Sequence, residues 1–377
     1  MKRSTTLAVL ALAGFFAAGC APKVDDSVIR IGEYDALTGD IATFGQTTHN
    51  GIQMAVDEVN AAGGINGKML KLITEDDQGK PDEASLVVEK LITRDQVHVV
   101  IGEVASSNSL AAAPMAQSHK IPMVSPSSTN PKVTAVGDYI FRVCFIDPFQ
   151  GKVMAKFAKD TLKAKTAIIF RDQKSDYSIG LADVFSKEFT AAGGIIADDK
   201  AYVAGDVDFK AQLTSFRDKK PDVLYVPGYY SEVGLIAKQV RQLGMKQPML
   251  GGDGWESPEL FKIGGAALDG CYYSNHCAPD SKDPLVVDFV KRHNALYKQD
   301  PGALTMLGYD AAKLTLDAIR RSKSLRGPDI RDALAATKDY VGVTGKISMD
   351  ENRNAVKSAV VLKIGGGKAT YLETVNP

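Results

Sequence analysis

Two short loops rich in hydroxyl side chains each follow an apolar run of the sequence. The first loop contains Ser106 and follows the run Val97–Ile101, and the second contains Ser127, Ser128 and Thr129. Hydroxyl groups and backbone N–H groups near the start of a helix donate hydrogen bonds and attract an anion. The same residue types also cap helices that bind nothing, so the loops alone leave both interpretations open.

An acidic residue and two tyrosines follow other strand-like runs. Asp253 stands between Gly252 and Gly254, and its carboxylate can accept a charge-assisted hydrogen bond from an ammonium group. Without other support it is equally a turn aspartate. Tyr229 and Tyr177 can cover an ammonium group with their rings, although a tyrosine at a strand end more often packs against its neighbours. Hydroxyl donors together with an acidic acceptor are what a free amino acid requires of a binding site.

The elements that must position these residues alternate between strand and helix. Val28–Gly32 and Met69–Thr74 are predicted strands, and the apolar spacing between them predicts a helix that ends at Gly63. The alternation restarts near Phe149, which predicts a second domain of the same kind. A helix-rich tail covers residues 284–336, and two strand-like runs close the chain. The fold class is therefore α/β, with two doubly wound parallel sheets whose ligands bind beyond the carboxyl ends of the strands.

The N-terminus predicts export. A positive start precedes the apolar run Leu7–Ala18, which at about 12 residues suits a signal peptide and is too short to span a bilayer. Small residues before Cys20 look like a bacterial lipobox, except that Ala17 stands where Leu is usual. We expect residues 1–19 to be removed and Cys20 to be lipidated; ordinary secretion with a free Cys20 is the alternative.

Composition excludes several classes of protein. The roughly 350 residues that remain suit two domains. Lys plus Arg equals Asp plus Glu at 45 each, and no long basic stretch occurs, which argues against nucleic-acid binding. The part of the chain after the signal peptide has no apolar run of about 20 residues, which a membrane-spanning helix needs.

Three further cysteines and the histidines give no clear site. Cys144 lies in an apolar run and is predicted to be a buried thiol. Cys271 and Cys277 can form a disulfide only if the chain between them folds back, so that bridge stays open. A zinc site from these two and His276 is disfavoured, because structural zinc sites have four ligands at tighter spacing.

The sequence has no motif for catalysis. The glycines around Asp253 and at 365–367 lack the Gly-x-Gly-x-x-Gly spacing between a first strand and helix. Neither Gly-x-Ser-x-Gly nor His-Glu-x-x-His occurs. We therefore expect no catalytic residue, no cofactor and no metal.

The stretch from Gly32 to Pro81 resembles the opening unit of the periplasmic leucine/isoleucine/valine-binding proteins, the substrate-binding components of ATP-driven amino-acid importers. The resemblance covers nearly all of the chain after the signal peptide. It implies the type I periplasmic-binding-protein fold, in which two lobes joined by a three-crossing hinge hold the ligand in the cleft between them. One lobe would comprise residues 27–147 and 277–346, and the other residues 148–276 and 347–377.

The resemblance also implies roles for particular residues. Ser106 and Thr129 match the positions that hold the ligand carboxylate, and Ser127 and Ser128 fall where backbone contacts are made. Asp253 matches the acidic position for the ammonium group, where Glu is common.

Several apolar and aromatic positions match as well. Tyr177 and Tyr229 match aromatic contacts, and Phe44 matches a position that is often Tyr. Leu304 lies near a further contact. Trp255 would line the side-chain pocket or cap the cleft. A separate question is Glu103, which would either favour a polar or cationic ligand or point to solvent.

The function implied is capture of an amino acid by hinge closure and its delivery to permease subunits in the inner membrane. Branched aliphatic amino acids are the family default. We expect a monomer in the periplasm or on the outer cell envelope, anchored through Cys20. Two alternatives stay open: a sensing protein for a signalling partner, and a protein for another small solute such as an amide or an aromatic acid.

Overall fold

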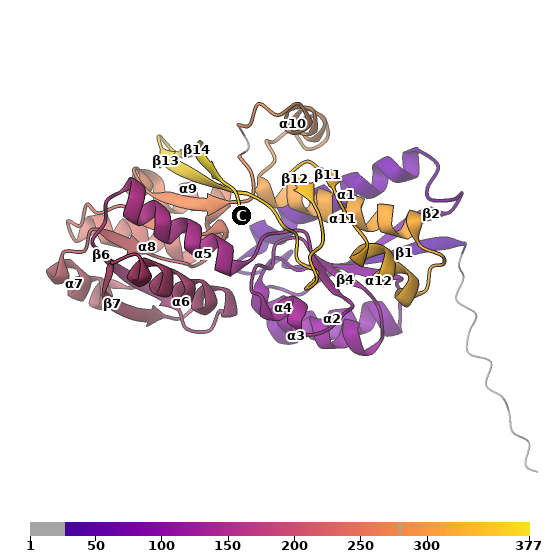
Figure 1. Ribbon diagram of the computed structural model, residues 1–377, viewed down its shortest axis with the longest axis horizontal. Helices are drawn as coiled ribbons and strands as arrows, with labels where there is room; N and C mark the ends of the chain where they lie inside the picture. The colour runs from indigo at the N-terminus through magenta and orange to yellow at the C-terminus, as the bar shows by residue number, and fades with distance from the viewer. Residues whose placement is uncertain (1–26, 279) are drawn as a thin grey trace, which may run out of the picture.

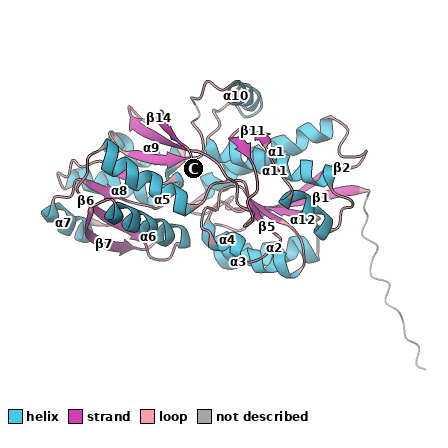
Figure 2. Cartoon of the chain, in the orientation of Figure 1, coloured by secondary structure: helices cyan, strands magenta, loops and turns pink. Residues whose placement is uncertain are grey.

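The computed structural model describes residues 27–278 and 280–377, which form two α/β bodies side by side (Figure 1). The predicted signal peptide and the predicted lipidation site Cys20 lie outside the described residues. In both bodies, helices surround a central sheet (Figure 2).

The first sheet has five parallel strands in the order β2-β1-β3-β4-β5. Its central strands are short apolar runs buried on both faces, as parallel sheets require. The strands are β1 (Val28–Asp35), β2 (Met69–Asp76), β3 (Val99–Ile101), β4 (Met123–Ser125) and β5 (Ile140–Arg142).

Helices cover both faces of this sheet. Alternate residues of β3 face opposite sides: Val100 packs with α2 (Pro81–Thr93) and α3 (Ser106–Ser118), whereas Val99 joins the cluster that contains α1 and α11. Pro81 opens α2 where a missing N–H costs nothing. The remaining helices of this body are α1 (Ala42–Ala61), α4 (Lys132–Ala135), α10 (Pro284–Tyr297), α11 (Ala303–Arg321) and α12 (Gly327–Ala335).

The second sheet has seven strands in the order β14-β13-β10-β9-β8-β6-β7, and its first five in chain order repeat the plan of the first sheet. The two strands at the end of the chain add to it antiparallel. The strands are β6 (Thr166–Asp172), β7 (Ile195–Tyr202), β8 (Val223–Tyr225), β9 (Met249–Gly251), β10 (Tyr272–Asn275), β13 (Ala359–Gly365) and β14 (Lys368–Val375).

The second sheet is also covered on both faces. One face packs against α5 and α6, and the other against α7, α8 and α9. These helices are α5 (Asp147–Lys156), continued by the π-helical turn η1 (Phe157–Thr161), α6 (Asp176–Ala191), α7 (Lys210–Lys219), α8 (Tyr230–Gln242) and α9 (Pro258–Gly264), with 3-10 turns η2 (Asp253–Trp255) and η3 (Gly265–Leu268).

Three connections join the two bodies within the described residues. The first leads from β5 to α5 and the second from β10 to α10. The third leads from the hairpin of β11 (Tyr340–Gly342) and β12 (Gly345–Ile347) to β13. The last strands therefore return to the second sheet.

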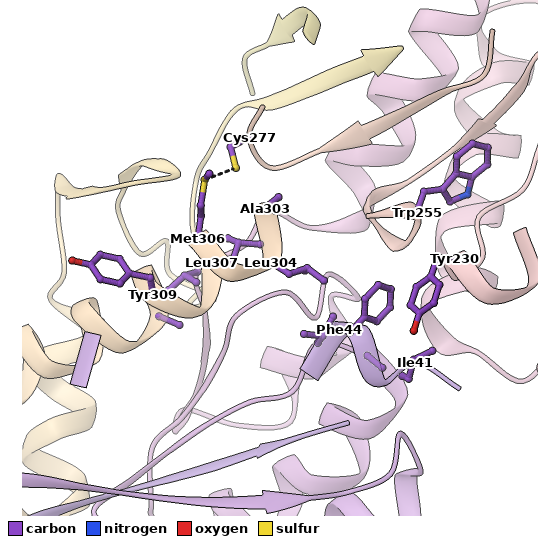
Figure 3. Packing of buried hydrophobic residues seen from close by; sticks show 14 of the residues in the cluster. Ile41, Phe44, Tyr230, Trp255, Cys277, Ala303, Leu304, Met306, Leu307 and Tyr309 are labelled. Atoms are coloured by element: carbon purple, nitrogen blue, oxygen red, sulfur yellow. Dashed lines mark hydrogen bonds between the residues drawn. The ribbon is translucent and has the colours of Figure 1, made fainter. Parts of the chain in front are cut away.

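The cysteines of the described residues are all free thiols. Cys144 is buried, as predicted, and Cys271 and Cys277 are buried without a bridge between them. Cys277 lies instead with its sulfur 3.4 Å from that of Met306 (Figure 3). No helix within residues 27–278 or 280–377 combines the length and the apolar character needed to cross a membrane.

Candidate functional site

A small cavity lies where strand ends of the two sheets meet, and five of the eight residues predicted to contact a ligand line it. Its lining comes from the start of α1, from the loops after β3, β4 and β8, and from α6, η2 and α11. The lining residues are Phe44, Val104, Ser127, Tyr177, Tyr229, Asp253, Gly254 and Leu304.

The hydroxyl side of the site belongs to the first body. The Ser127 hydroxyl is buried and has no hydrogen-bond partner among the described residues. The Thr129 hydroxyl is also buried and makes no hydrogen bond of ordinary geometry; it lies near the carboxyl of Asp147, where it partly opposes the rise in pKa that burial causes. A buried hydroxyl without a partner is costly in a folded protein, so the Ser127 hydroxyl, which lines the cavity, is available to an incoming acceptor. Thr129 does not line the cavity, so its contact with a ligand stays a prediction.

The hydroxyls of Ser106 and Ser128 are engaged in hydrogen bonds between the two loops. The Ser128 hydroxyl donates to the backbone oxygen of Glu103 at 2.8 Å, and its backbone N–H donates to the Ser125 hydroxyl at 2.8 Å. The Ser106 hydroxyl accepts from the backbone N–H of Asn130 at 3.2 Å. Neither residue lines the cavity, so contact with a carboxylate stays a prediction for both, and their observed role is to tie the two loops together.

The acidic side of the site belongs to the second body. Asp253 begins η2, and its backbone N–H donates to the side-chain oxygen of Gln150 at 3.0 Å. Its Oδ2 lies 3.0 Å from Nε2 of His276, while Oδ1 is buried without a partner among the described residues. One carboxylate oxygen is thus held in place, and the other is free to accept a hydrogen bond.

Three aromatic rings form a wall of the cavity. Tyr177 and Tyr229 stack with their ring centroids 5.4 Å apart. Phe44 packs edge-to-face with Tyr229, with the two ring centroids 5.3 Å apart. Burial raises the pKa of both tyrosines well above the usual value, so the phenols are neutral. The Tyr177 hydroxyl accepts from the N–H of Gly254 at 3.0 Å, which joins α6 to η2.

The rings leave little room between them. The cavity measures about 10 Å³, the order of a single water site. Phe44 also packs against Tyr230 of the second body, with the ring centroids 5.0 Å apart, and Leu304 of α11 lies on the same side as Phe44 (Figure 3). An amino acid is larger than this space, so its entry requires the two bodies to separate or the rings to move.

The structure excludes one of the two expectations for Glu103 and both expectations for Trp255. Glu103 does not point to solvent: it is fully buried, and its carboxylate accepts from the N–H of Ala105 and, at 3.1 Å, from Asn108. Trp255 lies in the core of the second body, where its Nε1 donates to the backbone oxygen of Val226 at 2.9 Å. Its ring packs against Gly251, so it neither lines the cavity nor caps it.

Sequence reasoning missed the residues that support Asp253. His276 was considered only as a metal ligand, although it follows β10 at the same sheet edge as Asp253 follows β9. That placement is the signal that identifies it. Among the described residues, no group of three or more His, Cys, Asp or Glu side chains is arranged to hold a metal ion.

A larger cavity of about 950 Å³ lies beside the connections between the bodies, and none of the eight predicted residues lines it. It is bordered by the segment that leads into α10, by β12 and the segments on either side of it, and by β13, β14 and the last residue, Pro377. The small cavity is the candidate site in spite of its size, because it joins the unpaired Ser127 hydroxyl of the first body to the unpaired Oδ1 of Asp253 of the second.

Comparison with known proteins gives consistent matches along the chain. The family model described as periplasmic binding protein matches residues 28–368. A leucine-, isoleucine-, valine-, threonine- and alanine-binding protein of Pseudomonas aeruginosa is 30% identical over 93% of this chain and 92% of that protein.

Solved structures agree with the sequence matches. A leucine-binding protein LivK from Thermotoga maritima is 40% identical, with a TM-score of 0.89 over 93% of this chain and 99% of that one. The branched-chain amino-acid transporter substrate-binding protein LivJ from Streptococcus pneumoniae, in complex with isoleucine, is 35% identical, with a TM-score of 0.88 over 93% of this chain and 100% of that one.

Proposed function

The chain belongs to the family of periplasmic binding proteins, and from that premise we propose that it is the substrate-binding component of an ATP-driven importer whose ligand is a branched aliphatic amino acid. The observation that carries the ligand class is the pairing in one cavity of the unpaired Ser127 hydroxyl with the unpaired Oδ1 of Asp253. The first can donate to a carboxylate, and the second can accept from an ammonium group.

Each part of the ligand has a partner in this proposal. Ser127 and Thr129 bind the carboxylate, with the loop ends at Ser106 and Ser128 beside it. Asp253 binds the ammonium group, and the stacked rings of Tyr177 and Tyr229 cover it. The aliphatic side chain packs among the apolar lining residues Phe44, Val104 and Leu304.

Capture proceeds by closure of two lobes about the three connections. We assign residues 27–147 and 277–346 to one lobe and residues 148–276 and 347–377 to the other. The closed lobes present the bound amino acid to permease subunits in the inner membrane. The protein acts as a periplasmic monomer anchored through a lipid on Cys20.

Ligand analogues test which groups are recognised. Leucine is compared with its amide, which lacks the carboxylate, and with 4-methylpentanoate, which lacks the amine, by titration calorimetry on lipid-free protein from which bound ligand has been removed. Leucine is expected to bind at least about 100-fold more tightly than either analogue, because the amide lacks the charge of the carboxylate and 4-methylpentanoate leaves the buried Asp253 carboxylate without a partner. Equal binding of 4-methylpentanoate and leucine would refute an ammonium site.

An Asp253→Asn variant tests the acidic partner directly. Its affinity for leucine is expected to fall by about 2–5 kcal/mol, the cost of removing one partner of a buried charge pair. Asp218→Asn is the matched control, because that carboxylate is 71% exposed on α7. Unchanged leucine affinity in Asp253→Asn would remove this residue from the site.

The other interpretations give different outcomes in the same experiments. An aromatic acid has no ammonium group and would leave the Asp253 carboxylate without a partner, so benzoate is expected not to bind. A solute-binding protein from R. palustris in complex with benzoate is 23% identical with a TM-score of 0.84, which shows the shared fold alone. A role in sensing predicts a signalling protein, instead of a permease, encoded beside this chain.

A further inference from the structure

His276 occupies a position where the site meets the connections between the two bodies. It directly follows β10, in the second connection, and its side chain is fully buried. Its ring stacks on Phe145 of the first connection, with centroids 3.8 Å apart and planes 25° from parallel. The same ring contacts Asp253 through Nε2 at 3.0 Å. One side chain therefore links the acidic group of the site to two of the three connections.

The hydrogen-bonding pattern fixes which nitrogen of the ring carries a proton. Burial lowers the pKa of His276, so the imidazole is neutral and donates through only one nitrogen. Nδ1 has no partner among the described residues, whereas Nε2 lies beside Oδ2 of Asp253. The proton therefore lies on Nε2, and the ring donates to the carboxylate.

A second contact holds Asp253 from its backbone. The side-chain oxygen of Gln150 accepts from the backbone N–H of Asp253 at 3.0 Å and from the Ser274 hydroxyl at 2.9 Å. With Oδ2 bound to His276 and the backbone bound to Gln150, rotation of the carboxylate is restricted. Oδ1 is left as the oxygen that can accept from a ligand.

We propose that His276 is the positioning residue of the ammonium site: by donating from Nε2 to Oδ2 of Asp253, it directs Oδ1 toward the ligand's amine. The inference deepens the proposed function and rests on it. It predicts that His276 contributes to affinity only for ligands that carry an ammonium group. A residue that merely packs the connections would affect every ligand alike.

Two variants separate the hydrogen bond from the packing. His276→Phe keeps an aromatic ring against Phe145 and removes the donor, whereas His276→Gln keeps an N–H donor and removes the ring. Dissociation constants for leucine and 4-methylpentanoate are measured for both variants and for the unchanged protein. The preference for leucine is expected to fall about 10- to 100-fold in His276→Phe, the usual effect of losing a hydrogen bond to a charged group. It is expected to stay within about 3-fold in His276→Gln, because the donor to the charged group is retained.

The opposite results overturn the proposal in distinct ways. Equal weakening of both ligands in His276→Phe would make the residue structural and overturn its positioning role. Equal binding of both ligands by the unchanged protein would overturn the proposed function and this inference together, and that result needs no variant.

A measurement on the unchanged protein serves if His276→Phe does not fold. With ¹⁵N-labelled histidine, the His276 signals are assigned by their loss in His276→Gln. The proposal requires the Nε2–H tautomer and a shift of Nε2 on addition of leucine. A ring protonated on Nδ1, or one that leucine leaves unchanged, would overturn it.

Discussion

Asp147 is a buried carboxyl beside the site with an altered proton affinity. It begins α5, and its Oδ2 has no hydrogen-bond partner among the described residues. Burial raises its pKa from 3.8 to about 7; the charge of Asp253 adds to the rise, and Thr129 and Arg142 oppose it. Near pH 7 the Asp147 carboxyl is therefore about half protonated.

The stability of the protein is expected to depend on this proton. The unfolded chain loses it near pH 4 and the folded chain near pH 7, so stability falls as pH rises between these values. A pKa raised from 3.8 to about 7 corresponds to at most about 4 kcal/mol. Asp147→Asn is therefore expected to gain stability relative to the unchanged protein from pH 4 to pH 7, as measured by urea unfolding. Asp218→Asn should show no such gain, and a constant difference for Asp147→Asn across this range would contradict the raised pKa.

Among the elements, the pairing of α1 with α11 sets the first body's side of the cavity. A Cβ atom on Gly51 would lie 2.0 Å from the backbone oxygen of Thr305, and one on Gly308 would lie 2.4 Å from that of Thr48. The two helices therefore approach backbone to backbone, with a glycine on each. Because α1 carries Phe44 and α11 carries Leu304, this close approach fixes two apolar lining residues together.

A Gly51→Ala substitution is expected to force α1 and α11 apart. The free energy of unfolding should fall by about 1–3 kcal/mol, the usual cost of overpacking. Gly365→Ala is the control, because a Cβ atom there meets no atom within 4 Å. Denaturant unfolding of both variants measures the difference; equal stabilities would mean that the helices separate without cost.

The sequence predicted most elements but not their contacts. The apolar spacing of α1 and the glycines after it were sufficient to place that helix, yet its partner α11 lies some 250 residues away and left no local signal. The strand β7 was missed because it is an edge strand whose charged, half-buried residues lack an apolar pattern.

The sequence also predicted the positions of some residues of the candidate site but not of others. Strand ends located Ser127 and Asp253, because parallel strands bring their carboxyl ends together. Nearness in sequence misplaced Trp255, since η2 turns it away from the cavity that Asp253 lines. His276 was missed because its contact with Asp253 depends on how β10 lies beside β9.

At the scale of the whole molecule, hydrogen bonds join the two bodies on both sides of the cavity. On one side the Ser107 hydroxyl accepts from the backbone N–H of Asp176 at 3.0 Å, and Asn130 donates to the backbone oxygen of Asp176 at 2.7 Å. On the other side the Tyr230 hydroxyl donates to the backbone oxygen of Asp40 at 3.2 Å. None of these contacts needs a ligand, and together they would stabilise the closed arrangement proposed for capture.

Ser107→Ala is expected to weaken binding without touching the ligand. Loss of the hydrogen bond between Ser107 and Asp176 should raise the dissociation constant about 3- to 10-fold, mainly through faster dissociation, and equally for every ligand bound. Ser118→Ala, at the exposed far end of the same helix, is the control. Stopped-flow kinetics with two different amino acids distinguishes this result from a change of specificity, which would contradict the closed-state role.

The position of Trp255 has a practical consequence. It is the only tryptophan of the chain, it is buried in the second body, and it follows the acidic residue of the site by two positions. Its fluorescence therefore reports on one place without any label. Unfolding of the second body would shift this emission to the red as the indole meets water, while unfolding confined to the first body would be silent. Ligand capture that displaces η2 would change the intensity of the Trp255 fluorescence, so binding could be followed without an added label.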